Sequence, residues 1–173
     1  SMKLRTQNSN FEFSGRMVNL TEPEKLWFDM KGNNLKIDAR DTKIYTPGLP
    51  IPDYTHVGAV TGDVTYKGEP INFETTFDVQ SSVGNAKGFF NLNLTTPNFN
   101  YSTSVDLTKG NIGKVIKDPK MESDINGHFE AIGSGFELAN INTTLKYELR
   151  DTKLLEQKID KSQGVINLRG YNV

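Results

Sequence analysis

The stretch that decides the fold is Phe99-Asn100-Tyr101-Ser102-Thr103-Ser104-Val105-Asp106-Leu107. Apolar and polar residues alternate along it. The aromatic and aliphatic side chains occupy odd-numbered positions, and most of the polar side chains occupy even-numbered ones. Successive side chains of a β-strand point to opposite faces, whereas a helix repeats every 3.6 residues. The stretch is therefore predicted to be a strand with one apolar and one polar face.

The same alternation recurs on both sides of this stretch. It is clear over residues 71–79 and 141–150 and weaker over 11–13, 26–30, 35–39, 90–94 and 166–168. Turn residues separate these runs, in particular at 31–34, 66–70, 83–85 and 96–98, and three of the seven prolines lie in the irregular stretch 46–53. Such spacing is typical of antiparallel hairpins, and it predicts about ten to twelve strands. One short helix is expected over 111–116, ending before Asp118-Pro119, whereas 154–159 fits a helix, a strand or a loop.

Strands with one apolar face must cover that face. A second sheet does this in a sandwich, and the same sheet does it by curling over. A parallel sheet covered on both sides is excluded because continuous apolar runs are missing. The expected fold is all-β, a curled antiparallel sheet of the β-taco or groove-like kind with a hydrophobic concave face. Ser1-Met2 is interpreted as a cloning scar, and residues 3–173 as one β domain that is a fragment of a longer extended β protein.

Composition excludes several classes of function. The 173 residues carry a net charge of -1, which removes the electrostatic basis for nucleic-acid binding. There are no cysteines and only two histidines, His56 and His128, so neither a metal site nor a cofactor is expected. No apolar run reaches the ~18 residues that a membrane-spanning helix needs.

Motifs that would carry chemistry are incomplete. The stretch 110–114 has the spacing Gly-x-x-Gly-Lys, which is too short for a phosphate-binding loop, and 133–135 lacks a third glycine. The acidic residues of 118–124 do not follow a calcium-loop pattern. No catalytic residue is assigned, and the chain is not expected to be an enzyme. Trp27 is interpreted as a structural aromatic or as a platform on which a sugar stacks.

The apolar face itself is the candidate site. It fits either the closed core of a sandwich or a hydrophobic concave surface that holds acyl chains. The residues expected to line such a groove are Ile71, Phe73, Phe77, Val79, Phe99, Tyr101, Val105, Leu107, Ile141, Leu145, Tyr147 and Leu149.

Several stretches together resemble the interior of TamB-type translocation and assembly module proteins, which belong to the AsmA-like superfamily. The resemblance covers most of the chain from about Phe13 to Val173, and the motifs that carry it lie at 45–52, 58–66, 84–90, 107–116, 123–127 and 133–136. In the later motifs it consists of a short helix, a strand with an inner glycine and a Gly-x-Gly-Phe strand.

This resemblance implies a periplasmic segment, soluble by itself, of a long protein anchored in the inner membrane of a two-membrane bacterium. The family is associated with phospholipid movement between the two membranes and with outer-membrane protein assembly beside an Omp85-type barrel. The implied ligand is a phospholipid or another acyl chain, and the family supplies no catalytic residue. Two alternatives stay open: a β-sandwich module that binds a glycan or a protein surface, and a structural β spacer.

Overall fold

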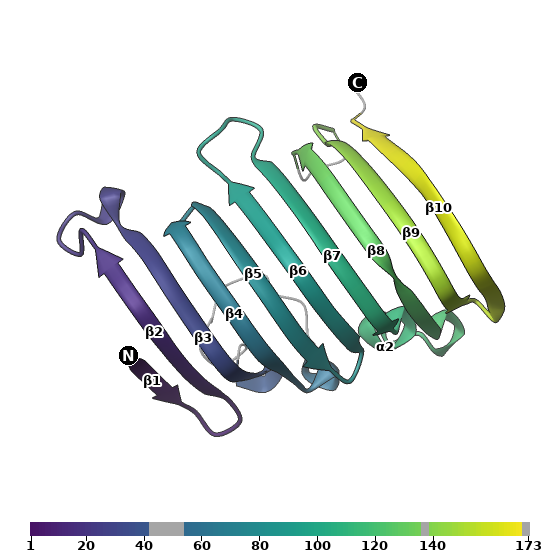
Figure 1. Cartoon of the computed structure of the whole chain (residues 1–173), viewed down its shortest axis with the longest axis horizontal. Coiled ribbons are helices and arrows are strands. Elements are labelled where there is room, and N and C mark those ends of the chain that lie inside the picture. Colours follow the sequence, from purple (N-terminus) through teal and green to yellow (C-terminus); the bar gives the residue numbers. More distant parts are fainter. Residues whose placement is uncertain (42–53, 136–138, 171–173) are drawn as a thin grey trace.

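The computed structural model of the chain describes residues 1–41, 54–135 and 139–170. The whole of the predicted loop 46–53, together with the expected motif residue Phe136, lies outside these ranges. Within them the chain forms a single antiparallel sheet of ten strands, each paired with its neighbours in chain order (Figure 1). The prediction of an all-β antiparallel fold is confirmed.

All the strands except the short β1 are 9 to 13 residues long. The strands are β1 Met2–Arg5, β2 Asn10–Val18, β3 Trp27–Asp38, β4 Ala59–Glu69, β5 Asn72–Ser81, β6 Gly84–Asn93, β7 Asn100–Gly110, β8 Ser123–Ser134, β9 Asn142–Leu154 and β10 Gln157–Arg169. The helical elements are η1 Pro23–Lys25, η2 Thr55–Val57, α2 Ile112–Ile116 and η3 Pro119–Met121.

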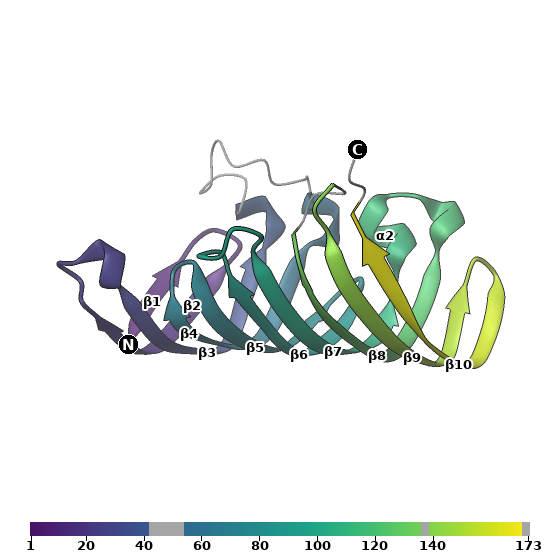
Figure 2. The same cartoon turned by 90° about the horizontal axis from the view of Figure 1, so that it is seen from above.

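The sheet bends along the strands into a trough. Figure 2 shows the strands rising on both sides of a common base, with β1 and β10 as the two open edges. The register places Val105 of β7 between Gly88 of β6 and Phe129 of β8, and Phe77 of β5 on the far side of Gly88. This apolar face, called the inner face from here on, is the better buried of the two faces and lies on the concave side. The described chain is thus a curled sheet rather than two stacked sheets.

Two predicted turns are wrong. Residues 66–69 of the expected turn 66–70 belong to β4, and the turn to β5 is made by Pro70 and Ile71. Residues 31–34 were expected to separate two strands, but β3 runs through them as one strand and keeps its pairing to β4 on both sides of a bulge between Gly32 and Leu35. Asn34 adopts a φ of 50° there, and its N–H donates to Asp63 Oδ1 at 2.8 Å. The Gly-Asn-Asn composition therefore accommodates an irregularity inside the strand. The ambiguous stretch 154–159 contains the end of β9, the tight turn at 155–156 and the start of β10.

The expected helix is present as α2. Asn111 precedes it, and its Oδ1 accepts the N–H of Lys114 at 2.9 Å, while Lys117 ends the helix with a left-handed φ of 60°. His56 of η2 contacts the same helix, since its Nε2 lies 3.0 Å from the Val115 carbonyl oxygen. Consequently η2 and α2 lie along the same rim of the trough (Figure 2).

Two buried carboxylates lie at the end of β3, and one of them, Asp41, holds the turn between β1 and β2 against it. Asp41 is 4% exposed, and it accepts hydrogen bonds from the Thr6 hydroxyl, from Asn8 Nδ2 at 2.9 Å and from Ser9 Oγ at 2.5 Å. Asp38 is 2% exposed and accepts from Arg40 Nε and Nη2 at 2.8 and 2.7 Å. Hydrogen bonds from Arg40 lower the pKa of Asp38 to about 2, and those from Ser9, Thr6 and Asn8 lower the pKa of Asp41.

These carboxylates should make the fold sensitive to acid. A lowered pKa means that the ionised form stabilises the folded state above the ordinary carboxyl pKa of 3.8, and that this stability is lost as the pH falls towards about 2. We expect the melting temperature of the wild type to fall more steeply between about pH 4 and pH 2.5 than that of Asp38→Asn. Parallel melting curves for the two proteins would show that the Asp38–Arg40 pair adds nothing.

Candidate functional site

The inner face brings together most of the residues expected to line a groove. Register pairs join Phe73 to Leu92 and Leu92 to Tyr101, and two rows farther along the same face Phe129 to Tyr147. The predicted residues that lie in strands of this face are Phe73, Phe77, Val79, Tyr101, Val105, Leu107, Leu145, Tyr147 and Leu149. The apolar positions predicted from alternation in β5, β7 and β9 thus lie on one continuous face that extends from β5 to β9.

Three of the predicted residues lie outside the strands. Ile71 occupies the turn between β4 and β5 and is 49% exposed, and Phe99 precedes β7 with a φ of 45° and is 41% exposed. Ile141 immediately precedes β9, where its carbonyl oxygen accepts the N–H of Gly170 at 2.6 Å. The alternating pattern was extended one residue too far at each of these strand starts.

Sequence reasoning missed residues of the inner face on β4 and β8. Val64 and Tyr66 lie on β4 between Gly62 and Gly68, and Phe129 lies on β8 between Gly127 and Gly133. A glycine in a polar-apolar pattern reads as a break, so alternation in these strands was not recognised. If glycine is counted as an apolar residue, the alternation continues through both strands and predicts them.

Aromatic rings form a connected row over four strands of the inner face. Phe28 of β3 meets Tyr66 of β4 edge-on with ring centroids 5.8 Å apart, and Tyr66 stacks on Phe73 of β5 at 4.7 Å. Phe90 of β6 continues the row 6.4 Å from Phe73. Such contacts fix the side chains and leave an apolar surface of ring edges and faces.

Several hydroxyl groups of the inner face are bonded within the protein. The hydroxyls of Thr75 and Thr103 donate to the carbonyl oxygens of Thr65 and Phe89, at 2.6 and 2.7 Å. The Tyr66 hydroxyl donates to the Glu69 carbonyl oxygen at 2.8 Å, and burial raises its pKa. With their hydroxyls engaged, these side chains contribute mainly carbon to the face.

The inner face is not sealed from solvent. Among the described residues, Leu35 is the only hydrophobic one that is buried, at 2% exposure. The other hydrophobic side chains of the inner face are half-buried or exposed, and towards the open edges Leu4 and Ile166 are 54% and 44% exposed. A closed core of this size would bury most of its members, so a broad apolar surface stays accessible.

The outer face contains one arrangement that resembles a hydrolase triad. Ser104 Oγ lies 3.3 Å from His128 Nε2, and His128 Nδ1 lies 2.8 Å from Asp106 Oδ1, which raises the pKa of His128. At this point β7 is hydrogen-bonded to β6 on one side and to β8 on the other. Its main-chain N–H groups are therefore engaged in the sheet, and they cannot stabilise an oxyanion as a hydrolase requires. Glu130 lies 3.6 Å from the same Nε2. We interpret the group as a surface charge network.

Other candidate motifs serve the local structure. Asp118 Oδ1 accepts the N–H of Lys120 at 2.9 Å at the start of η3, and Asp124 Oδ1 accepts from Asn126 Nδ2 at 3.0 Å. In the described ranges no three His, Cys, Asp or Glu side chains gather in a way that would hold a metal ion. None of the helices in those ranges combines the length and the apolar character needed to cross a membrane.

Comparison with known proteins does not identify a relative of this chain. A scan against protein-family models and searches of curated proteins and of solved structures found no match. The resemblance to TamB-type proteins therefore stays a prediction, and the inner face is the feature from which a function can be proposed.

Proposed function

We propose that the inner face holds the acyl chains of phospholipids and carries them along the trough. The observation that carries this proposal is the combination of a broad apolar face, internally bonded hydroxyls and incomplete burial across the whole sheet. The core of an ordinary domain is shielded from solvent, and an ordinary solvent-exposed face is polar. The inner face is apolar and yet accessible to solvent. An acyl chain is the ligand that such a surface fits, because it needs only dispersion contacts and shelter from water.

Energetics support a carrier that needs no catalytic group. Exposing acyl chains to water costs about 0.8 kcal/mol for each CH₂, so two chains of about 30 CH₂ groups cost on the order of 20 kcal/mol. A continuous apolar surface removes most of this barrier at each step. The lipid then moves by exchanging one set of apolar contacts for the next.

The dimensions of the sheet suit acyl chains. Ten strands at about 4.8 Å spacing give a trough roughly 45 Å long, whereas one leaflet of a bilayer core is about 15 Å thick. A chain lying across the strands would contact three or four of them. The trough is therefore long enough for chains to occupy successive positions.

The wider setting of this activity is proposed from the resemblance. In it, the chain is a periplasmic segment of a TamB-type protein that spans the space between inner and outer membranes. The lipid it carries would supply outer-membrane biogenesis, and in the full protein an Omp85-type barrel would be the partner.

Charged substitution of the inner face provides the test. We expect wild-type protein, produced in bacteria and purified without detergent, to carry phospholipid detectable by native mass spectrometry and by extraction. Val105→Lys places an ammonium group among the acyl-chain contacts and should abolish that occupancy. The matched control is Ser104→Lys, which adds the same charge one residue away on the outer face and should leave the lipid bound.

Circular dichroism and thermal melting decide how a loss is interpreted. Lipid lost from a Val105→Lys variant that keeps its fold supports the groove. If Val105→Lys unfolds while Ser104→Lys does not, the inner face is a closed core and the proposal fails. Absence of lipid from the wild type, with no uptake of a fluorescent phospholipid from vesicles, would favour the structural spacer.

A further inference from the structure

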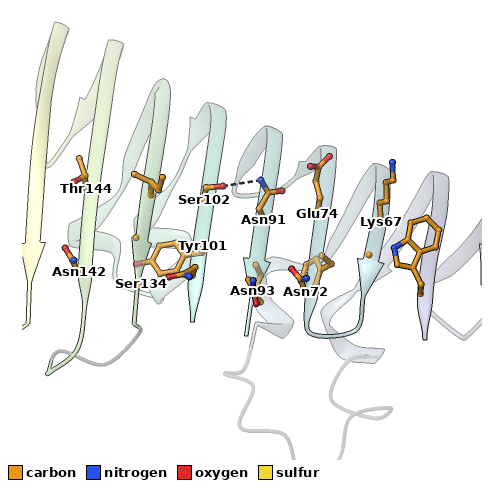
Figure 3. Close-up of a pocket in the computed structure, with 17 residues that line it drawn as sticks. Lys67, Asn72, Glu74, Asn91, Asn93, Tyr101, Ser102, Ser134, Asn142 and Thr144 are labelled. Carbon is orange, nitrogen blue, oxygen red and sulfur yellow. Dashed lines mark hydrogen bonds between the residues drawn. The ribbon is translucent and has the colours of Figure 1, made fainter. Parts of the chain in front are cut away.

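A depression on the outer face of the trough is unlike the rest of that face. It has a volume of about 840 Å³ and crosses the sheet from Trp27 on β3 to Thr144 on β9 (Figure 3). Two rows of short neutral side chains line it, and they point away from the trough. The rows include Asn72, Asn93 and Asn142 near the strand ends, and Asn91, Ser102 and Thr144 farther along the strands.

Asn91 lies at the centre of this depression and lacks a partner for one atom. Its Nδ2 donates to Ser102 Oγ at 3.1 Å, as Figure 3 shows. Its Oδ1 is shielded from solvent and, among the described residues, accepts no hydrogen bond. A buried acceptor without a donor is unfavourable, so this oxygen indicates a missing hydrogen-bonding group.

Apolar side chains interrupt the polar rows. Ile132 lies between Ser102 and Thr144 in register and is 66% exposed, although its neighbours on this face are polar. Trp27 closes one end of the depression, where the Arg16 guanidinium lies 5.5 Å from the ring centroid. A ligand that fits must offer both hydroxyl groups and an apolar C–H face.

The charges of the lining residues further restrict the class of ligand. The charged side chains among the lining residues are Lys67 and Glu74, which are register partners on β4 and β5. Their charges cancel, and amides and hydroxyls each act as both donor and acceptor. A phosphate, a nucleic acid or a polyanion would find only the single charge of Arg16, at the Trp27 end, to attract it.

We propose that the outer-face depression binds a neutral linear oligosaccharide that runs across the strands. Its hydroxyls and amide groups pair with the asparagine and hydroxyl rows, and the Asn91 amide turns towards the ligand so that Oδ1 accepts a hydrogen bond from one of them. The C–H faces of its sugars pack on Ile132 and Trp27. Neighbouring strands repeat the polar side chains at about 4.8 Å, so successive sugars meet equivalent partners on successive strands.

The test uses the hexasaccharide of β-1,4-linked N-acetylglucosamine as the probe. Trp27 is the only tryptophan in the chain, so its fluorescence reports directly on one end of the depression. We expect saturable fluorescence change and matching heat in calorimetry. Asn91→Ala and Ile132→Asp should each weaken binding by at least about tenfold. Asn85→Ala is the matched control, because it removes the same side chain from the same face of β6 outside the depression.

The outcome does not depend on the lipid proposal. Val105→Lys changes the inner face and should bind the hexasaccharide as the wild type does, even where it has lost phospholipid. No binding up to ~5 mM, either of this probe or of cellohexaose, would overturn the proposal. Equal weakening by Asn91→Ala and Asn85→Ala would overturn it as well, since binding would then be spread over the polar face.

Discussion

Replacing Gly88 with alanine should destabilise the sheet by at least about 3 kcal/mol. Gly88 lies on the inner face of β6, between Phe77 and Val105. A Cβ at this position would lie 2.0 Å from the Ser104 carbonyl oxygen and 2.9 Å from the Val105 Cα. Both atoms belong to the main chain of β7, so relief requires β6 and β7 to separate and lose ladder hydrogen bonds in the middle of the sheet.

Urea unfolding followed by circular dichroism measures this effect. Gly164→Ala is the control, because it adds the same methyl group to the inner face of β10, where the nearest atom is the Tyr147 hydroxyl at 2.8 Å. That side chain can turn aside, so the cost should be about 1 kcal/mol or less. Equal free energies of unfolding for the two variants would contradict the view that β6 and β7 approach too closely for a side chain.

Replacing Thr152 with valine should cost about 2–3 kcal/mol of folding free energy, although the two side chains have nearly the same shape. Thr152 is 1% exposed, and its hydroxyl accepts the N–H of Asn126 at 3.0 Å and donates to the Asn126 carbonyl oxygen at 2.9 Å. It does so where the register between β8 and β9 shifts between Asp124 and Gly127. The valine variant leaves both Asn126 main-chain groups without these bonds.

Amide hydrogen exchange at Asn126 distinguishes this local loss from a general one. In Thr152→Val we expect faster exchange of that amide together with a lower urea midpoint. Thr152→Ser keeps the hydroxyl and should lose about 1 kcal/mol, for the missing methyl group alone. If serine and valine destabilise equally, packing of the side chain rather than the bridge across the bulge accounts for the contribution of Thr152.

The two faces of the sheet separate the two proposed activities. Every strand presents alternate side chains to opposite sides, so Val105 and Ser104 differ by one residue and yet belong to different surfaces. Substitutions on one face can therefore be tested for an effect on the other. This independence makes the lipid and oligosaccharide experiments controls for each other.

Alternation within single strands predicted the central part of the sheet well. β5, β7 and β9 follow the polar-apolar pattern that was recognised, and Asn111 begins the expected helix. Prediction failed where a glycine or an asparagine replaced a side chain in the pattern. The bulge in β3 was taken for a turn, because Gly-Asn-Asn has the composition of one and only pairing to β4 reveals the continuous strand.

The sequence by itself determined that the chain forms antiparallel strands with one apolar face, because side-chain parity is a local property of each strand. Tertiary structure decided how those strands align, since register depends on contacts between residues far apart in the chain. Alignment gathers glycines beside large side chains on the inner face, as at Gly88, and allows the sheet to bend around that face. It also places Asn91 beside Ser102 and leaves Asn91 Oδ1 without a partner among the described residues. No single strand encodes either arrangement, because each arises only where neighbouring strands meet.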